Sequence, residues 1–235
     1  MTTSTLTGPY REVPSPSSIA TITGVRDLYV LGNDKLLDHK AIGICGSRHA
    51  SESGLERAYE FGRAAALKGA TVVTGYARGV DRQAHRGALE AGGATVAVLP
   101  EGIRYFRLVK DLRAIVNEEN FLAVSMFPPD AVWQSWRAME RNKLIVGLSL
   151  ALFVIEAKDK GGTIHAAEES QRQGKPVYAV AFKNGGPGRE GNQELIDRYA
   201  LPVATIKQLK DALDAVLSGS GQRTGQLSMG MDTPA

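Results

Sequence analysis

Short apolar runs alternate with longer amphipathic stretches through most of the chain. Six runs rich in β-branched residues are apolar on both faces and predict buried strands, at residues 41–46, 71–74, 94–99, 121–125, 151–156 and 177–181. The stretches around them repeat apolar residues at helical spacing and predict helices at 51–68, 81–91, 139–148, 163–173, 191–199 and 206–217. Strands joined by helical crossovers form parallel sheets. The pattern therefore predicts an α/β fold with a doubly wound, mostly parallel sheet and helices on both faces.

The two ends of the chain lack this alternation. Residues 1–18 are polar and interrupted by prolines, and residues 218–235 are polar and rich in glycine. Such compositions are typical of flexible segments. We therefore expect a flexible N-terminal segment at 1–18, one folded domain at 19–217 and a disordered tail at 218–235.

No segment predicts insertion into a membrane. The most apolar stretch, residues 144–155, is too short to cross a bilayer, and residues 1–18 hold no apolar core behind a basic start. The single cysteine, Cys45, excludes a disulfide within the chain, and a reducing compartment is its natural setting. We expect a cytoplasmic protein that does not contact a membrane.

Charge and composition narrow the function only slightly. The chain of 235 residues has 28 Lys and Arg residues against 25 Asp and Glu residues, a formal net charge of +3. So small an excess permits an anionic partner without requiring one, because local clustering of charge matters more than the total. His49, His85 and His165 lie in separate segments without the spacing of metal ligands, so we expect no metal site and no cofactor.

Four loops, each next to a predicted strand or helix, combine cations with glycine or asparagine. In a doubly wound sheet, ligands bind beyond the carboxyl ends of the strands, where glycine and helix N–H groups can approach a phosphate. Each loop alone also fits a tight turn with a solvated cation, but several at one sheet edge predict an extended anion-binding rim. The candidate residues are Gly46, Ser47, Arg48 and Ser51 in the first loop, Gly75, Arg78 and Gly79 in the second, Arg141, Asn142 and Lys143 in the third, and Lys158, Gly161, Gly162 and Thr163 in the fourth.

Asp81 and His85 follow the second loop and lie one helical turn apart. Such a pair can form an acid–base couple, but no Ser or Cys nucleophile with an evident partner accompanies it. We expect Asp81 to cap the helix or lie in its first turn, and His85 to be a structural, hydrogen-bonding histidine. Aromatic residues make up 6% of the chain, and the candidates for stacking on bases, with core packing as the alternative, are Phe127, Trp133 and Trp136.

Taken together, these motifs resemble the DNA-processing protein A (DprA/Smf) family, in the superfamily that also holds the "lonely guy" (LOG) proteins. The resemblance covers about residues 24–210 and is carried above all by residues 77–89, which read A-x-G-x-D-x-x-A-H-x-G-A-L. The segments 46–48, 141–143 and 191–192 also match, and Asn192 is a candidate structural polar residue. Membership would imply an extended Rossmann-like domain, single-stranded DNA binding in a strand-end pocket, a homodimer, and delivery of the RecA recombinase to DNA during transformation.

The resemblance also implies roles for particular residues. Residues 46–48 would hold phosphates, residues 141–143 would line the same pocket, and residues 161–163 would close it. The chain departs from the family pattern at Met126, where the family usually has Glu, and at 160–163, which replace a Ser-Gly-Ser-type turn. A helical N-terminal domain and a winged helix, which family members often add, do not fit this sequence.

Two other functions remain open for the same pocket. One is hydrolysis of nucleoside monophosphates, as in LOG proteins, whose P-G-G-x-G-T-x-x-E motif supplies a carboxylate. Here Ala166 stands at the position of that Glu and no proline precedes Gly161, which disfavours hydrolysis. The other is a sensor that binds a free nucleotide without turnover. We therefore expect a non-catalytic, single-stranded DNA-binding recombination mediator, in which phosphates are neutralised by Arg48, Arg78, Arg141, Lys143 and Lys158.

Overall fold

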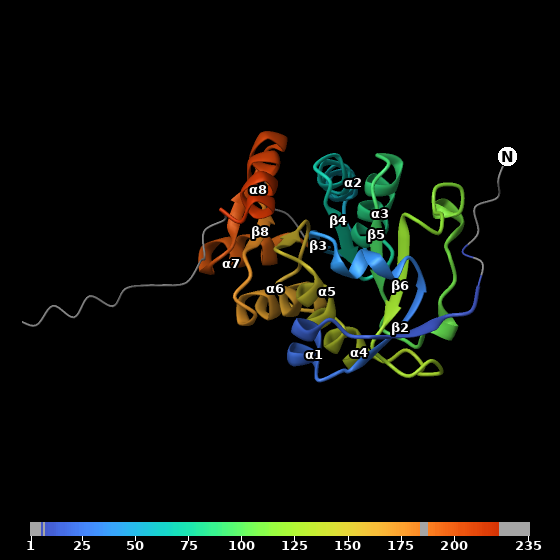
Figure 1. The fold of residues 1–235 in the computed structure, drawn as a ribbon. Helices are drawn as coiled ribbons and strands as arrows, with labels where there is room; N and C mark the ends of the chain where they lie inside the picture. The colour runs from blue at the N-terminus through green and yellow to red at the C-terminus, as the bar shows by residue number, and fades with distance from the viewer. Residues whose placement is uncertain (1–5, 7, 184–187, 221–235) are drawn as a thin grey trace, which may run out of the picture.

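The computed structural model describes residues 6, 8–183 and 188–220, and within them the chain forms one nine-stranded sheet (Figure 1). Strand order is β1-β2-β6-β5-β4-β3-β7-β8-β9. Pairing is parallel from β3 to β9, whereas β1 and β2 run antiparallel to their neighbours. The strands are β1 (Arg11–Pro14), β2 (Asp27–Gly32), β3 (Ala41–Cys45), β4 (Thr71–Thr74), β5 (Thr95–Val98), β6 (Phe121–Ser125), β7 (Leu152–Val154), β8 (Val177–Val180) and β9 (Leu201–Val203).

Helices cover both faces of the sheet. The α-helices are α1 (Ser17–Thr23), α2 (Glu52–Leu67), α3 (Val80–Glu90), α4 (Ser135–Glu140), α5 (Asn142–Leu148), α6 (Gly162–Arg172), α7 (Glu190–Arg198) and α8 (Ile206–Ser218), and the short 3₁₀ turns are η1 (Asp34–Asp38), η2 (Ile103–Tyr105) and η3 (Lys110–Leu112). One face packs against α2, α3 and α8, and the other packs against α1, α5 and α6. The predicted α/β, doubly wound architecture is confirmed.

Strand β3 illustrates why a run that is apolar on both faces becomes a central strand. Successive side chains of a strand point to opposite faces. Ile42 and Ile44 enter the core with α2, α3 and α8, while Ala41 and Cys45 enter the core on the other side. From β3 the chain builds outward through β4, β5 and β6, and then crosses to β7 on the opposite side. This reversal creates a switch point between β3 and β7, where open α/β sheets bind ligands.

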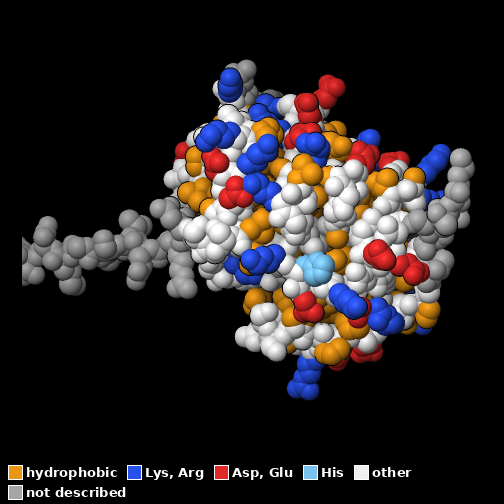
Figure 2. Space-filling model, turned by 45° about the horizontal axis from the view of Figure 1, so that its top comes forward, with side chains coloured by type: hydrophobic (Ala, Val, Ile, Leu, Met, Phe, Trp, Pro, Cys, Tyr) orange, Lys and Arg blue, Asp and Glu red, His pale blue; other side chains and the backbone are white. Residues whose placement is uncertain are grey.

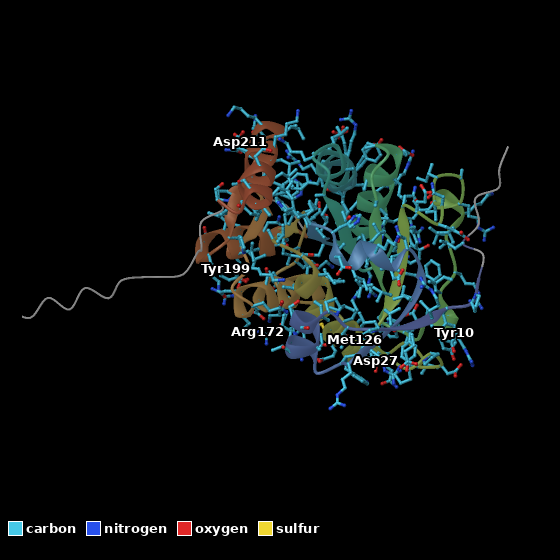
Figure 3. All side chains as sticks on the ribbon, in the orientation of Figure 1. Tyr10, Asp27, Met126, Arg172, Tyr199 and Asp211 are labelled. Atoms are coloured by element: carbon cyan, nitrogen blue, oxygen red, sulfur yellow. The ribbon has the colours of Figure 1, made fainter. Side chains whose placement is uncertain are left out.

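The strands that the sequence pattern missed lie toward the two ends of the sheet, β1 and β2 at one end and β9 at the other. Part of the segment expected to be flexible, Arg11–Pro14, is strand β1, and Arg11 forms an ion pair with Asp34 at 3.1 Å. β1 and β2 carry exposed or half-buried residues, so they lack runs that are apolar on both faces. Figure 3 places Tyr10 at this edge and Tyr199 near the opposite one. Residues 1–5, 7 and 221–235, which include most of the expected tail, lie outside the described residues.

Other boundaries shift by a few residues. The helix expected at 139–148 begins earlier, at Ser135, and is divided at Arg141 into α4 and α5. The backbone of Arg141 keeps helical angles, with φ −55° and ψ −27°, so the interruption is slight. No helix in the described part of the chain is both long and apolar enough to span a bilayer.

Candidate nucleic-acid interface

The carboxyl ends of β3, β4 and β5 open onto two adjoining hollows of about 420 and 430 Å³. Both are lined by Arg48, Gly75, Ala77, Trp133 and Arg141, so they form one continuous depression, which we call the strand-end groove. The first hollow extends toward α5 and α6, and the second toward the loop after β5. The groove lies where the order of the strands reverses, as expected for a ligand site of this fold.

Residues from all four predicted loops meet in this groove. Candidates separated by more than a hundred positions along the chain are brought together by the parallel strands, whose carboxyl ends share one edge. The predicted residues that line the first hollow are Gly46, Ser47, Arg48, Gly75, Arg141, Asn142, Lys158, Gly162 and Thr163, and Arg78 lines the second. Lys160, which the fourth loop also offers for phosphate binding, and the aromatic candidate Trp133 line the first hollow as well.

Four predicted residues do not line the groove. Lys143 turns away and pairs with Glu140, with 2.6 Å between Nζ and Oε1. Gly79 has a φ of +83°, and a Cβ on it would lie 2.4 Å from the carbonyl oxygen of Ser47, so this glycine allows two loops to pack together. Gly161 precedes α6 with a φ of +122°, a backbone conformation that favours glycine.

Ser51, the fourth, caps helix α2. Its Oγ accepts a hydrogen bond from the N–H of Gly54 at 3.1 Å, and its own N–H donates to Oε1 of Glu156 at 2.9 Å. The sequence suggested that a phosphate binds at the N-terminus of α2. The carboxylate of Glu156 already occupies that place. The first loop is left to contact a ligand mainly through Arg48, whose exposed side chain lines both hollows.

Arg141 supplies a fixed positive charge at the wall shared by the two hollows. Its guanidinium is buried, and Nη1 donates to the carbonyl oxygen of Val98 at 2.5 Å. Gly75 makes room for it, because an added Cβ would lie 2.1 Å from Nη1. Burial lowers the pKa of Arg141 and the charge of Asp81 opposes that shift, while burial raises the pKa of Asp81. An arginine stays protonated in proteins even so.

The cations at the mouth of the groove are available to a ligand. Among the described residues, no carboxylate forms an ion pair with Arg48, Lys158 or Lys160. Helix α6 starts beside them without a side-chain cap, so its first N–H groups have no side chain as acceptor. On the face of the molecule shown in Figure 2, basic and acidic side chains are interspersed. The groove is therefore distinguished by its local cluster of cations, and not by the net charge of the chain.

Asp81 and His85 do not form an acid–base couple. Asp81, in the first turn of α3, accepts a hydrogen bond from the N–H of Ala77 at 3.2 Å. His85 is fully buried, and its Nδ1 lies 2.5 Å from the hydroxyl oxygen of Thr95. That hydroxyl donates to the carbonyl oxygen of Val72, so Nδ1 of His85 is the donor in the contact with Thr95. Burial lowers the pKa of His85 to about 3, which keeps the ring neutral.

Asn192 also has structural contacts. Its Nδ2 donates to the carbonyl oxygens of Ile155 and Val180, and its Oδ1 accepts from the N–H of Ala157 at 2.7 Å. The side chain thereby joins α7 to the ends of β7 and β8.

Of the three aromatic candidates, Trp133 alone borders the groove. Phe127 is buried, and Trp136 meets it edge-on with ring centroids 6.0 Å apart. Trp133 is 51% exposed and lines both hollows, so its ring surface is accessible to a ligand. Nothing in the sequence distinguished it from Trp136, three positions later. Within the described ranges, no group of three or more His, Cys, Asp or Glu side chains could hold a metal ion.

Comparison with known proteins identifies the family. Residues 16–214 match the model of DNA recombination-mediator protein A. The chain is 32% identical over 200 residues to Protein Smf of Escherichia coli (strain K12), covering 84% of the chain and 54% of that relative. It is 27% identical over 188 residues to the DNA processing protein DprA of Bacillus subtilis (strain 168), covering 79% of the chain and 63% of that relative. The chain thus spans between half and two thirds of the length of these relatives.

Solved structures share the fold. The DNA processing protein A of Streptococcus pneumoniae superposes with a TM-score of 0.76 at 25% identity, covering 85% of this chain and 73% of that one. The DNA processing protein A of Helicobacter pylori superposes with a TM-score of 0.77 at 22% identity, covering 91% and 98%. Because the family model matches residues 16–214, most of this chain, the chain belongs to the DNA recombination-mediator protein A (DprA/Smf) family.

Proposed function

We propose that this chain binds single-stranded DNA in the strand-end groove and acts as a recombination mediator without catalysing a reaction. The observation that carries the proposal is the convergence of Arg48, Arg141 and Lys158, from three separate segments of the chain, on one groove that Trp133 borders. Cations that follow a phosphate backbone beside an aromatic platform are typical of sites that bind single strands with little reading of sequence.

Each part of the groove would have its own role. Arg48 and Lys158 would neutralise phosphates at the mouth, and the buried guanidinium of Arg141 would present a charge in a fixed position. The uncapped start of α6, with Thr163 in its first turn, would add N–H donors. Trp133 would stack on a base, a contact that every base can make.

The relatives support this proposal. The family model carries the name of a recombination mediator, and the solved structure from Helicobacter pylori is described by its single-stranded DNA binding mode. On the family alone, we extend the proposal to a homodimer in the cytoplasm that delivers RecA to the bound strand.

Hydrolysis of nucleotides is the weaker alternative. Among the described residues, the carboxylate that lines the first hollow is that of Asp81, which the N–H of Ala77 and the charge of Arg141 engage. At the position of the LOG-family Glu, the first hollow is lined by Ala166. A glycosidic bond beside α6 would therefore lack the carboxylate that the LOG motif supplies to stabilise an oxocarbenium-like sugar. The carboxylate of Glu101 lines the second hollow, toward the loop after β5.

Replacing Arg48 tests the site. Arg48→Ala should weaken binding of oligo-dT by about 1–3 kcal/mol, the range of a charge-assisted contact. It should also lower the slope of log affinity against log salt by about 0.7, the value for one phosphate contact on a single strand. Lys143→Ala is the matched control, because Lys143 pairs with Glu140 outside the groove. Unchanged affinity of Arg48→Ala at matched salt would contradict the site.

A second titration separates the three functions. Oligo-dT and AMP are compared over a range of salt, and release of ribose phosphate from AMP is followed in parallel. We expect oligo-dT to bind more tightly, with a linear salt dependence and no release. Tight capture of AMP without turnover would support the nucleotide sensor, and turnover would support the hydrolase.

A further inference from the structure

Glu156 lies two residues after the end of β7. Its carboxylate is buried beside the loop that carries Arg48. Its side chain is 3% exposed. Oε1 accepts from the N–H of Ser51 at 2.9 Å, and Oε2 accepts from the hydroxyl of Ser51 at 2.5 Å. Serine and glutamate lie 105 positions apart, so this contact is set by tertiary structure. A buried carboxylate is costly unless its acceptors are filled, as they are here.

Residue 156 holds this loop at both ends. At the start of the loop, the N–H of Ser47 donates to the carbonyl oxygen of Glu156 at 2.7 Å. At its end, Ser51 bonds to the carboxylate of the same residue. Arg48 lies between the two anchors, with its side chain in both hollows. Besides the packing of the second loop on Ser47, the backbone on both sides of Arg48 is therefore held by contacts with one residue, Glu156.

Helix α2 leaves room for this carboxylate. A Cβ on Gly54, in the first turn of α2, would lie 2.6 Å from Oε2 of Glu156. Real Cβ atoms do not approach other atoms so closely, and the buried carboxylate has little space to retreat. Glycine at this position of a helix costs about 1 kcal/mol relative to alanine. Gly54 thus weakens the helix at the position where it contacts the carboxylate of Glu156.

Arg189 balances the charge of the carboxylate. Its Nε lies 3.5 Å from Oε2 of Glu156, and its Nη2 donates to the hydroxyl of Ser51 at 2.9 Å. The guanidinium also lies over the ring of Phe182, 4.0 Å from the centroid. The hydroxyl of Ser51 therefore accepts from Gly54 and Arg189, and its proton goes to Glu156. This arrangement requires a group at position 156 that accepts and does not donate.

We propose that Glu156 is a positioning residue for phosphate binding: it does not touch DNA, and it holds the loop that aims Arg48 into the strand-end groove. The inference rests on the proposed function, since it assigns Glu156 an effect on DNA that passes through Arg48. An amide at position 156 would place a donor against the hydroxyl of Ser51 and the guanidinium of Arg189. The loop would then lose the anchor at its end, and Arg48 would lose its fixed direction.

A double-mutant cycle tests the proposal. Wild type, Glu156→Gln, Arg48→Ala and the double variant are titrated with oligo-dT, and the melting temperature of each is measured without DNA. We expect Glu156→Gln alone to weaken binding between about threefold and tenfold, part of the effect of a lost charge-assisted contact. In the Arg48→Ala background the same change should have an effect of less than about twofold, because coupled residues are not additive. Glu194→Gln, which removes an exposed pair with Arg198, is the control and should leave affinity unchanged.

Gly54→Ala perturbs the same carboxylate from the helix side and changes no charge. We expect it to weaken binding in the wild type and not in the Arg48→Ala background, and to lower the melting temperature although alanine favours a helix. If Glu156→Gln weakens binding equally in both backgrounds, or leaves it unchanged while Arg48→Ala weakens it, the positioning role is wrong and the DNA site stands. If Arg48→Ala itself has no effect, the proposed function fails instead.

Discussion

The buried neutral histidine of α3 makes the stability of this protein depend on pH in a way that one substitution can isolate. His85 is fully buried against Thr95, and burial lowers its pKa from 6.5 to about 3. In the unfolded chain the ring titrates near its ordinary value. Between the two values the unfolded chain binds a proton that the folded protein excludes. Stability is therefore lost as the pH falls below 6.5.

The size of this effect follows from the shift in pKa. Each pH unit between the folded and unfolded pKa values changes the free energy of unfolding by about 1.4 kcal/mol. Between pH 7.5 and pH 4.5 the contribution of His85 should fall by about 2.7 kcal/mol, because only the two units below 6.5 count. His85→Gln keeps an N–H donor for the hydroxyl of Thr95 and removes the titration.

Urea denaturation of both proteins across this pH range measures the difference. Acidic groups titrate in wild type and variant alike, so the gap between their unfolding free energies reports His85. We expect the free energy of unfolding of the wild type to fall relative to that of His85→Gln as the pH falls. NMR of the ring C–H protons gives an independent reading, in which the His85 signal should not titrate above pH 4.5. Two parallel stability curves, or a His85 ring that titrates near its ordinary pKa, would refute the reasoning.

Two further substitutions concern the groove. Gly75→Ala would place a Cβ 2.1 Å from Nη1 of Arg141, so the guanidinium must move. Binding of oligo-dT should weaken by about 1–3 kcal/mol as a charged contact is lost, and undiminished affinity would show that the position of Arg141 does not matter. Trp133→Ala should cost about 1–3 kcal/mol, the value of stacking on one base, in the same titration. An equal loss in Trp136→Ala, whose ring packs on Phe127 outside the groove, would contradict a stacking role specific to Trp133.

The sequence by itself determined the central sheet and the region of the site. Strands β3 and β4 are buried on both faces, and this burial leaves unbroken apolar runs that are visible in the sequence. Parallel strands also send their carboxyl ends to one edge, so loops rich in glycine and cations could be expected to meet there. Edge strand β1 has an exposed, mixed pattern, and no signal of comparable strength marks it.

Only the tertiary structure decided which residues of those loops face the groove. Ser51 and Lys143 fit the sequence pattern as well as Arg48 does, yet each is engaged by a carboxylate, from Glu156 in one case and Glu140 in the other. A partner 105 positions away, such as Glu156, leaves no periodic trace near Ser51. The pair of Lys143 with Glu140 is local, three positions apart, so helical spacing in the sequence allows it. The contact of Ser51 with Glu156 exists only once the chain has folded, because tertiary structure alone brings these two residues together.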